Sequence, residues 1–380
     1  MHLTTFDPAA FLRDHWQQRP LLIRNPWDAW TNPLAADDLA GLACDDDIES
    51  RLVIAKPKSR KLEHGPFDEK RFAKLGKHPW TLLVQAVDHA VPEVAALLGA
   101  FRFIPNWRID DVMVSYATDG GGVGAHFDQY DVFLVQGAGQ RRWQVGGLCD
   151  HATELLPHDD LRLLADFEPV EEWLLDPGDI LYLPPRIAHN GIAVGDDCMT
   201  YSVGFRAPSR AELIAGWSDH ILETLGEDDR FADPGLPFQP NPGEIAPEAI
   251  ARLHAMVTEA MHDRAAFARW FGTYSSTPKN PDLDWSPEEP MTVEALRERL
   301  AAGATLVRNP ASRFSFVRQD ATMLLFVDGE CFECEGDAAG FAERVCGTDG
   351  LDRDSRDTLT DAVMLLAVRL CNQGGLSAER

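Results

Sequence analysis

The spacing of apolar and polar positions changes character along the chain. Between Asp111 and about Phe205, short runs of β-branched and aromatic residues such as "DVMVSYA", "YDVFLVQG", "RRWQVGG", "EEWLLDPGDILYLPP" and "CMTYSVGFRA" are separated by Gly, Pro or Asp. Such runs with turn residues between them are typical of an antiparallel barrel or sandwich. This region is therefore predicted to be a β domain.

The region before it is mixed. Asp7 followed by Pro8 is typical of a helix N-cap, and we predict a short helix through Trp16. "RPLLIRN" and the stretch 51–55 ("RLVIA") are expected to be strands. An amphipathic helix is predicted from about Pro79 to Leu98.

After Pro208 the apolar period lengthens from two to about 3.6 residues. Two long amphipathic helices are predicted, with apolar stripes at Leu213, Trp217, Ile221 and Leu225 and at Ile250, Leu253, Val257, Met261 and Phe271. A proline-rich connector, "DPGLPFQPNPGEIAP", separates them. Such a helical pair can pack against the rest of its own chain or form a dimer interface, and the sequence alone does not distinguish these two possibilities.

A second breaker-rich linker, "SSTPKNPDLDWSPEEP", precedes the last region. There we predict a helix over Val293–Leu300, strands at "TLVRN" and "RFSFVRQ", a hairpin turning at Asp328-Gly329, and a last helix at about Asp357–Leu370. This order suggests a winged-helix-like module. The predicted boundaries are 1–207 for the β domain with its N-terminal region, 208–275 for the helical region and 276–380 for the module.

Composition and net charge indicate which kinds of binding partner to expect. The chain has 380 residues, 45% of them hydrophobic, seven scattered cysteines and a formal net charge of −26. It has neither a signal-peptide pattern nor an apolar run of the ~20 residues that span a bilayer, so we expect a cytoplasmic protein without membrane contact. An acidic surface repels phosphate backbones and attracts basic proteins, so direct nucleic-acid binding is not expected.

The stretch "GGGVGAHFDQYD" holds the main candidate for chemistry. Side chains alternate faces along a strand, so His126 and Asp128 point the same way and can share one metal ion. His189, at the end of the β run "LYLPPRIAHNG", is the best candidate for a third ligand. Two histidines and one carboxylate leave coordination positions open, as in non-haem Fe(II) oxygenases.

An open ferrous site suggests 2-oxoglutarate as a bidentate co-substrate, which needs a basic residue for its distal carboxylate. "GAGQRRW" supplies Arg141 and Arg142 on the following strand, and only one of them can point into a barrel. Ser115, on the strand before His126, could donate a hydroxyl to the same carboxylate.

Two other motifs are rejected. The glycine run 120–122 is followed by neither a helix nor a GK[ST] sequence, so a phosphate loop is not expected. "CFEC" lacks a second cysteine pair, so strand alternation explains Cys331 and Cys334 more simply than a zinc site does.

Several long motifs carry a family resemblance. "GGGVGAHFDQYDVFLVQGAGQRRWQVG", "DPGDILYLPPRIAHNGIA", "YSVGFRAPS" and the early "FLRDHWQQRPLLIRN" resemble the bacterial JmjC-type ribosomal oxygenases, cupin-like arginine hydroxylases of a large-subunit ribosomal protein. The resemblance implies an α+β chain. Its double-stranded β-helix (jelly-roll) barrel would be followed by a helical dimerisation region and a C-terminal winged-helix-like domain.

The resemblance also implies site roles. Fe(II) would be bound by His126, Asp128 and His189, and 2-oxoglutarate by Arg141 with help from Ser115, with O₂ as the second co-substrate. The reaction would hydroxylate the β-carbon (C3) of one arginine in large-subunit ribosomal protein sixteen. The chain would be expected to form a homodimer.

An arginine target needs an acidic or aromatic receptor. Asp119, Tyr130 and Ser202, near the predicted barrel mouth, are the candidates. Two alternatives stay open: the same chemistry on another protein side chain, as in a histidine hydroxylase or a lysine demethylase, and a non-catalytic, metal-dependent regulatory cupin. Arg141 distinguishes them, since a regulator would not need a carboxylate anchor beside the metal.

Overall fold

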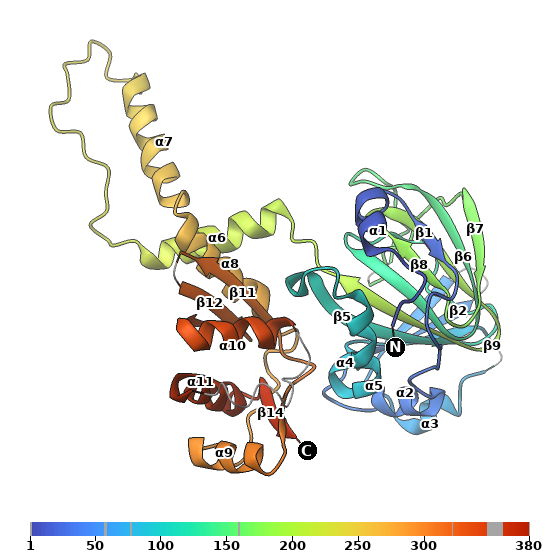
Figure 1. Ribbon diagram of the computed structural model, residues 1–380. Coiled ribbons are helices and arrows are strands. Elements are labelled where there is room, and N and C mark those ends of the chain that lie inside the picture. The colour runs from blue at the N-terminus through green and yellow to red at the C-terminus, as the bar shows by residue number, and fades with distance from the viewer. Residues whose placement is uncertain are drawn as a thin grey trace. The chain divides into compact units, whose positions relative to one another are not determined.

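The computed structural model describes residues 2–56, 59–76, 78–158, 160–320, 322–347 and 360–379 (Figure 1). The chain divides into two units. The first holds residues 1–207 with the segments 279–286 and 308–312, and the second holds the rest. Within the described residues, no helix is both long enough and apolar enough to cross a membrane.

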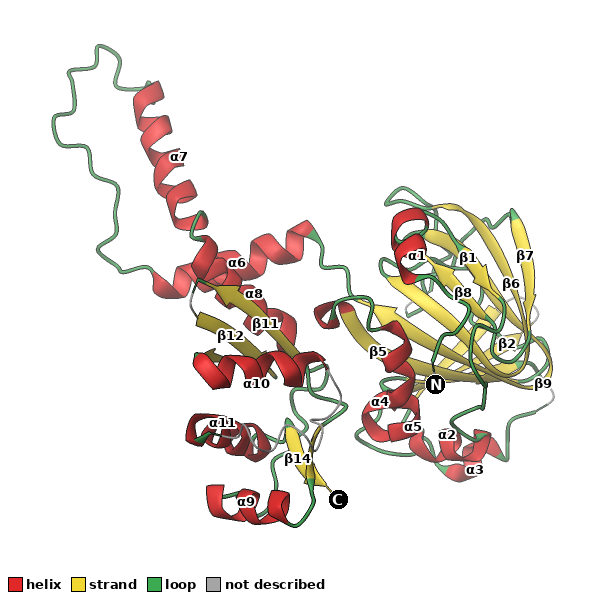
Figure 2. Cartoon of the chain, in the orientation of Figure 1, coloured by secondary structure: helices red, strands yellow, loops and turns green. Residues whose placement is uncertain are grey.

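The first unit is built on an antiparallel sheet. Its described strands are β1 (Leu21–Ile23), β2 (Ser50–Lys56), β3 (Ser59–His64), β4 (Trp80–Val84), β5 (Ile109–Ala117), β6 (Asp131–Leu148), β7 (Glu171–Leu175), β8 (Ile180–Leu183) and β9 (Ile187–Phe205). They pair in the order β1-β8-β6-β9-β5-β4-β2-β3, and β7 joins β6. Figure 2 shows these strands curving around one another as a barrel.

β6 and β9 are long because each bends through both sides of the barrel. The first part of β6 pairs with β8 and its second part with β7. Two separate strands were predicted here; the structure has one strand with a bulge between them. Gly139 makes the bend possible, since it has φ 58° and an added Cβ would lie 2.7 Å from the carbonyl oxygen of Asp197.

Alternation along β6 sends side chains to two different cores. Val132 and Leu134 pack into the barrel interior, whereas Phe133 and Val135 pack against the N-terminal helical layer. That layer contains α1 (Pro8–Asp14), α2 (Ala36–Leu42), α3 (Glu69–Phe72), α4 (Val87–Ala90), α5 (Pro92–Ala95) and the 3₁₀ turns η1 (Ala96–Phe101) and η2 (Asn106–Arg108). Asp7 caps α1 as predicted, accepting hydrogen bonds from the amides of Ala9 and Ala10.

The single helix predicted over Pro79–Leu98 is wrong. The apolar run at its start forms the strand β4, which is buried between β2 and β5, and the helical part is broken into α4, α5 and η1. Ala86 has φ 51° at the start of α4, and Pro92 opens α5. A continuous apolar run suits a strand covered on both faces as well as it suits a helix, so periodicity alone could not separate the two.

The second unit begins with α6 (Arg210–Thr224), α7 (Pro247–Met261) and α8 (Arg264–Ser276). Ser209 and Glu212 form a capping box at the start of α6. The second predicted long helix is two helices, because Asp263 caps α8 through the amides of Ala265 and Ala266. Phe271 therefore belongs to α8.

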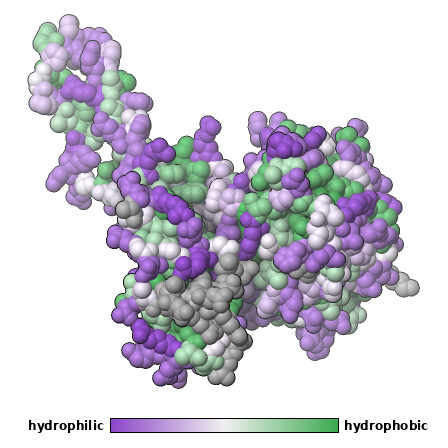
Figure 3. Space-filling view, viewed as in Figure 1, coloured by the Kyte–Doolittle hydropathy of each residue, from purple (hydrophilic) through white to green (hydrophobic). Residues whose placement is uncertain are grey.

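The apolar stripe of α7 does not enter the core of its unit. Ile250, Leu253, Val257 and Met261, here called the α7 stripe, have exposed fractions of 52, 40, 62 and 38%. Figure 3 shows apolar residues among polar ones along this segment. By contrast, Trp217 and Ile221 of α6 and Trp270 of α8 pack together in a buried cluster.

The C-terminal part contains α9 (Val293–Ala301), β10 (Thr305–Arg308), β11 (Phe314–Gln319), β12 (Thr322–Val327), β13 (Glu330–Cys334), α10 (Gly336–Gly347), α11 (Asp361–Asn372) and β14 (Leu376–Glu379). The predicted α9 and the hairpin at Asp328-Gly329 are confirmed. The helix α10 was not predicted from the sequence. Of the predicted last helix, residues 357–359 lie outside the described residues, and α11 continues two residues past Leu370.

Candidate active site

His126, Asp128 and His189 meet at the mouth of the barrel. Each offers one ligand atom, and the three atoms lie within 4.8 Å of one another. Nε2 of His189 is 3.6 Å from Oδ2 of Asp128, and the two imidazole rings have their centroids 4.3 Å apart. Within the described residues, no other group of three such side chains is close enough to hold a metal ion.

Backbone pairing brings the three residues together. His126 forms an isolated antiparallel bridge with His189 of β9, and the carbonyl oxygen of Asp128 accepts a hydrogen bond from the amide of Arg186. The segment that carries His126 and Asp128 is thus laid along the start of β9. Arg186 has φ 69°, which turns the chain after Pro185 into β9.

Both imidazoles are oriented by the backbone. Nδ1 of His126 lies 2.7 Å from the carbonyl oxygen of Gly124, and Nδ1 of His189 lies 2.9 Å from that of Ile187. A carbonyl oxygen only accepts, so each Nδ1 carries the proton and each Nε2 keeps its lone pair. This is the tautomer that a metal-binding histidine needs.

Burial keeps His189 neutral. The surrounding protein lowers the pKa of His189 to about 4, first through desolvation and then through the neighbouring His126. The imidazole therefore does not compete for a proton near neutral pH. A donor set of two neutral imidazoles and one carboxylate fits a divalent first-row metal ion.

A cavity of about 410 Å³ opens beside these residues. On its inner wall Arg141 is only 4% exposed, and its Nε and Nη2 atoms have no hydrogen-bond partner in the structure. The guanidinium lies 5.8 Å from the ring of Trp143, whose centroid is 5.9 Å from that of His189. A buried cation without a partner is costly, so this position suits an anionic ligand.

The structure separates the two arginines that strand alternation left undecided. Arg142 points out of the barrel and lies 3.4 Å from Glu172, whereas Arg141 faces the cavity. Ser115 also lines the cavity, with its hydroxyl 3.5 Å from the carbonyl oxygen of Thr200.

Of the three residues predicted to receive the target side chain, the structure brings two to the cavity. Tyr130 and Ser202 line it. Although Tyr130 is 43% exposed, desolvation beside the cavity raises the pKa of its hydroxyl, and the carboxylates of Asp128 and Asp111 add to the effect. Asp119 lies elsewhere, in an exposed turn where its carboxylate accepts a hydrogen bond from the amide of Gly195.

The acidic wall of the cavity comes from Asp110 and Asp111 instead. Oδ2 of Asp111 accepts hydrogen bonds from Gln85 Nε2 and the amide of Ala86 and lies 2.9 Å from Lys279 Nζ. Its Oδ1 lies toward Gly204, another residue of the cavity wall. Neither aspartate was predicted from the sequence, because both lie at the start of a strand, where alternation allows only one of two adjacent side chains to face inward. A bulge between Ile109 and Val112 interrupts that alternation.

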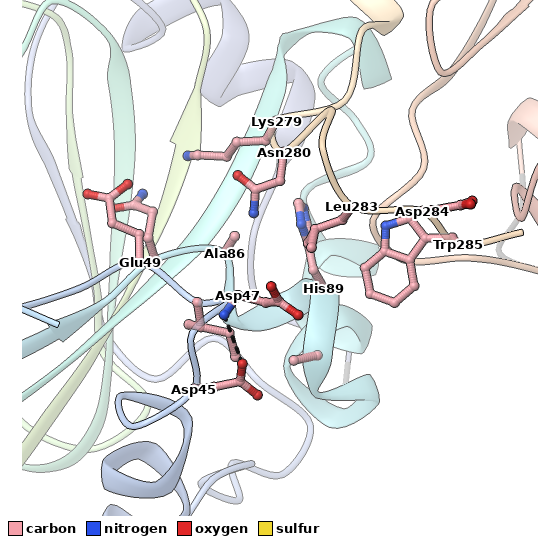
Figure 4. Close-up of a pocket in the computed structure, with 13 residues that line it drawn as sticks. Asp45, Asp47, Glu49, Ala86, His89, Lys279, Asn280, Leu283, Asp284 and Trp285 are labelled. Atoms are coloured by element: carbon pink, nitrogen blue, oxygen red, sulfur yellow. Dashed lines mark hydrogen bonds between the residues drawn. The ribbon is translucent and has the colours of Figure 1, made fainter. Parts of the chain in front are cut away.

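A second, smaller cavity of about 250 Å³ lies in the same unit. Figure 4 shows Lys279 and Asn280 on one side of it, with Asp45, Asp47 and Trp285 around the rest. Gln85 lines both cavities, so it is part of the wall between them.

Comparison with known protein families supports the fold. The JmjC domain family matches residues 96–213, and the ROXA-like winged helix family matches residues 259–376. The predicted α+β fold, a JmjC cupin barrel with a C-terminal winged-helix domain, is therefore confirmed.

Individual relatives match over most of the chain. The "Ribosomal protein uL16 3-hydroxylase" of Escherichia coli is 40% identical over 299 residues, covering 78% of this chain and 79% of that protein. The "Probable ribosomal oxygenase" of Haemophilus influenzae is 40% identical over 277 residues, covering 71% and 67%. The X-ray structure of E. coli YcfD matches with a TM-score of 0.90 and 34% identity over the whole of both chains. A second structure, described as YcfD in complex with cobalt and 2-oxoglutarate, matches with a TM-score of 0.87.

Proposed function

Because this chain belongs to the JmjC-type ribosomal oxygenases and is a 2-oxoglutarate-dependent dioxygenase, we propose that it hydroxylates the β-carbon (C3) of an arginine in the large-subunit ribosomal protein uL16. The observation that carries the proposal is the cavity in which His126, Asp128 and His189 lie beside an unpaired, buried Arg141. The E. coli relative named for hydroxylation of uL16 supports the choice of substrate.

We assign His126, Asp128 and His189 as the ligands of Fe(II). Two histidines and a carboxylate are the donor set of non-haem iron oxygenases and leave positions for co-substrates. A ferrous ion held there supplies the oxidative chemistry, in which O₂ and 2-oxoglutarate give succinate, CO₂ and a hydroxylated side chain. The backbone carbonyls of Gly124 and Ile187 hold the two imidazoles in the metal-binding tautomer.

Arg141 is assigned to the distal carboxylate of 2-oxoglutarate, with Ser115 beside it. A carboxylate would give the guanidinium the partner that it lacks in the protein. The ring of Trp143 separates Arg141 from His189, so the co-substrate can reach from the cation to the metal along that ring. A non-catalytic regulator would not need such an anchor.

The guanidinium of the target arginine is expected to meet the acidic wall. Asp111 and Asp110 carry two negative charges, one of which is offset by Lys279, at 2.9 and 3.2 Å from the two carboxylates. Tyr130 and Ser202 supply further polar contacts. Three donors fix Oδ2 of Asp111, which holds the carboxylate ready for a cation. A wall of this charge favours arginine over a neutral histidine, and the net charge of −26 attracts a basic ribosomal protein over a longer range.

We also propose that a second copy of the chain covers the α7 stripe. The four apolar residues lie at helical spacing and are 38 to 62% exposed. Exposing such an apolar face to water is unfavourable, so we expect a partner to cover it. A partner copy could bury it through a symmetric helix contact. The homodimer would act in the cytoplasm on the ribosomal protein, without binding nucleic acid directly.

The direct test is incubation of the purified protein with Fe(II), 2-oxoglutarate, O₂ and purified uL16, followed by mass spectrometry of the uL16 peptides. We expect one arginine to gain the mass of one oxygen atom, with succinate formed in equal amount. His189→Ala should abolish both products. Succinate without a modified peptide would contradict the substrate assignment, and absence of succinate while metal still binds would favour the regulatory alternative.

A further inference from the structure

Three side chains on the cavity wall share an unusual feature. Arg141, Trp143 and Thr81 each line the cavity and each carry a buried polar atom that has no hydrogen-bond partner in the structure. Arg141 is already assigned to the distal carboxylate. The hydroxyl of Thr81, on β4, has no role in the site as described so far.

Thr81 is not a surface hydroxyl that water can satisfy. The residue is 1% exposed, and Oγ1 neither donates to nor accepts from any described group. A buried hydroxyl without a partner costs free energy, and a valine of nearly the same shape would avoid that cost. The position therefore favours a group that arrives with a ligand.

Strand pairing links Thr81 to Arg141 through neighbouring strands that carry small buried residues. Thr81 pairs with Ala117 on β5, Ala117 pairs with Cys198 on β9, and Arg141 pairs with Ala193 on β9. Ala117, Ala193 and Cys198 pack together as one buried cluster. Both Thr81 and Arg141 line the same cavity, and because the clustered side chains between their strands are short, we expect one ligand to be able to reach both groups.

We propose that Thr81 binds the distal carboxylate of 2-oxoglutarate, donating a hydrogen bond to one oxygen while Arg141 holds the other. This rests on the proposed co-substrate site. Ser115 lies on the neighbouring strand β5, two residues before Ala117, the register partner of Thr81. Ser115 itself pairs with Leu83 on β4 and with Thr200 on β9. With Thr81 the carboxylate has donors on two sides, so its position and its distance from the metal are fixed. Thr81 thereby selects a dicarboxylic keto acid over a monocarboxylic one.

The test compares ligands that differ only in the distal carboxylate. Full-length protein loaded with Co(II) is titrated by calorimetry with 2-oxoglutarate and with 2-oxopentanoate, which lacks that carboxylate. For Thr81→Val we expect 2-oxoglutarate to bind roughly tenfold more weakly, while 2-oxopentanoate binds as it does to the unchanged protein. Thr81→Ser, which keeps the hydroxyl, should restore most of the affinity.

Three outcomes are distinguishable. If the unchanged protein fails to bind 2-oxoglutarate, the co-substrate site itself is wrong. If it binds and Thr81→Val binds equally well, the role of Thr81 is overturned. Equal weakening for both ligands also overturns it, because that would be a structural effect. The melting temperatures of both variants with Co(II) confirm that the comparison is made on folded protein.

Discussion

His126 and His189 are joined through their backbones. The amide of His126 donates to the carbonyl of His189 at 3.0 Å, and the amide of His189 donates back at 2.8 Å. This pairing fixes the separation of two residues that lie far apart in the sequence. The barrel fold therefore brings the two imidazoles together through the backbone, which would orient them to share one metal ion.

Loss of one imidazole should remove the metal while leaving the barrel folded. For His189→Ala we expect the affinity for Fe(II) or Co(II) to fall by at least about 100-fold. His262→Ala, which removes an exposed histidine at the end of α7, is the matched control and should bind metal normally. Calorimetry with Co(II) and the near-ultraviolet circular dichroism of both variants check the result. Retained affinity in His189→Ala would disprove the ligand assignment.

Arg141 and Arg142 provide a matched pair on adjacent positions and opposite faces. Replacing Arg141 with methionine leaves the distal carboxylate of 2-oxoglutarate without its cation, so we expect KM for 2-oxoglutarate to rise at least about 30-fold. Arg142→Met loses only an exposed ion pair with Glu172 and should leave KM unchanged. Steady-state assays of succinate release measure both. Similar KM values for the two variants would refute the assignment of Arg141.

These two arginines also show how far the sequence can lead. Strand alternation established that one would face the barrel, but the choice depended on the register of β6, which follows a bulge that a local pattern does not reveal. The HxD motif and His189 were predictable because turns and short strands mark their positions. The acidic wall could not be predicted in this way, because a bulge at the start of β5 lets both Asp110 and Asp111 face the cavity.

Variants of Asp111 and Asp119 test which aspartate binds the target arginine: Asp111, which lines the cavity in the structure, or Asp119, which was predicted from the sequence. Asp111→Asn removes a charge from the cavity wall, so we expect KM for the ribosomal substrate to rise by about tenfold or more. The affinity for 2-oxoglutarate should not change, which shows that the cavity stays folded. Asp119→Asn alters an exposed turn and should have no effect on either. The opposite pattern, with Asp119→Asn impaired and Asp111→Asn normal, would restore the original expectation.

The α7 stripe predicts a change in oligomeric state. A carboxylate introduced by Leu253→Glu would be buried in the proposed helix contact, so we expect the dimer to dissociate into monomers at micromolar concentration. Arg252→Glu places the same carboxylate on the other face of α7 and should leave the dimer intact. Light scattering coupled to size-exclusion chromatography measures the mass of each variant. A monomeric unchanged protein would contradict the proposed dimer directly.

Asp88 should make the stability of the first unit depend on pH. The residue is 2% exposed, its Oδ1 accepts a hydrogen bond from the amide of Val112, and His89, Asp111 and Lys279 are the charged or titratable groups near it. Burial raises the pKa of Asp88 from 3.8 to about 7. The folded protein thus keeps a proton that the unfolded chain loses.

The stabilisation from that proton is complete below pH 3.8 and is lost as the pH rises to about 7, above which a buried carboxylate must be tolerated. Asp88→Asn keeps the acceptor for Val112 and cannot ionise. We therefore expect its free energy of unfolding to match that of the unchanged protein near pH 4 and to exceed it by on the order of 2–4 kcal/mol at pH 8. Urea denaturation at several pH values measures the difference, with the exposed Asp233→Asn as control. A gap between Asp88→Asn and the unchanged protein that does not grow with pH would mean that Asp88 is ionised throughout, held so by Lys279.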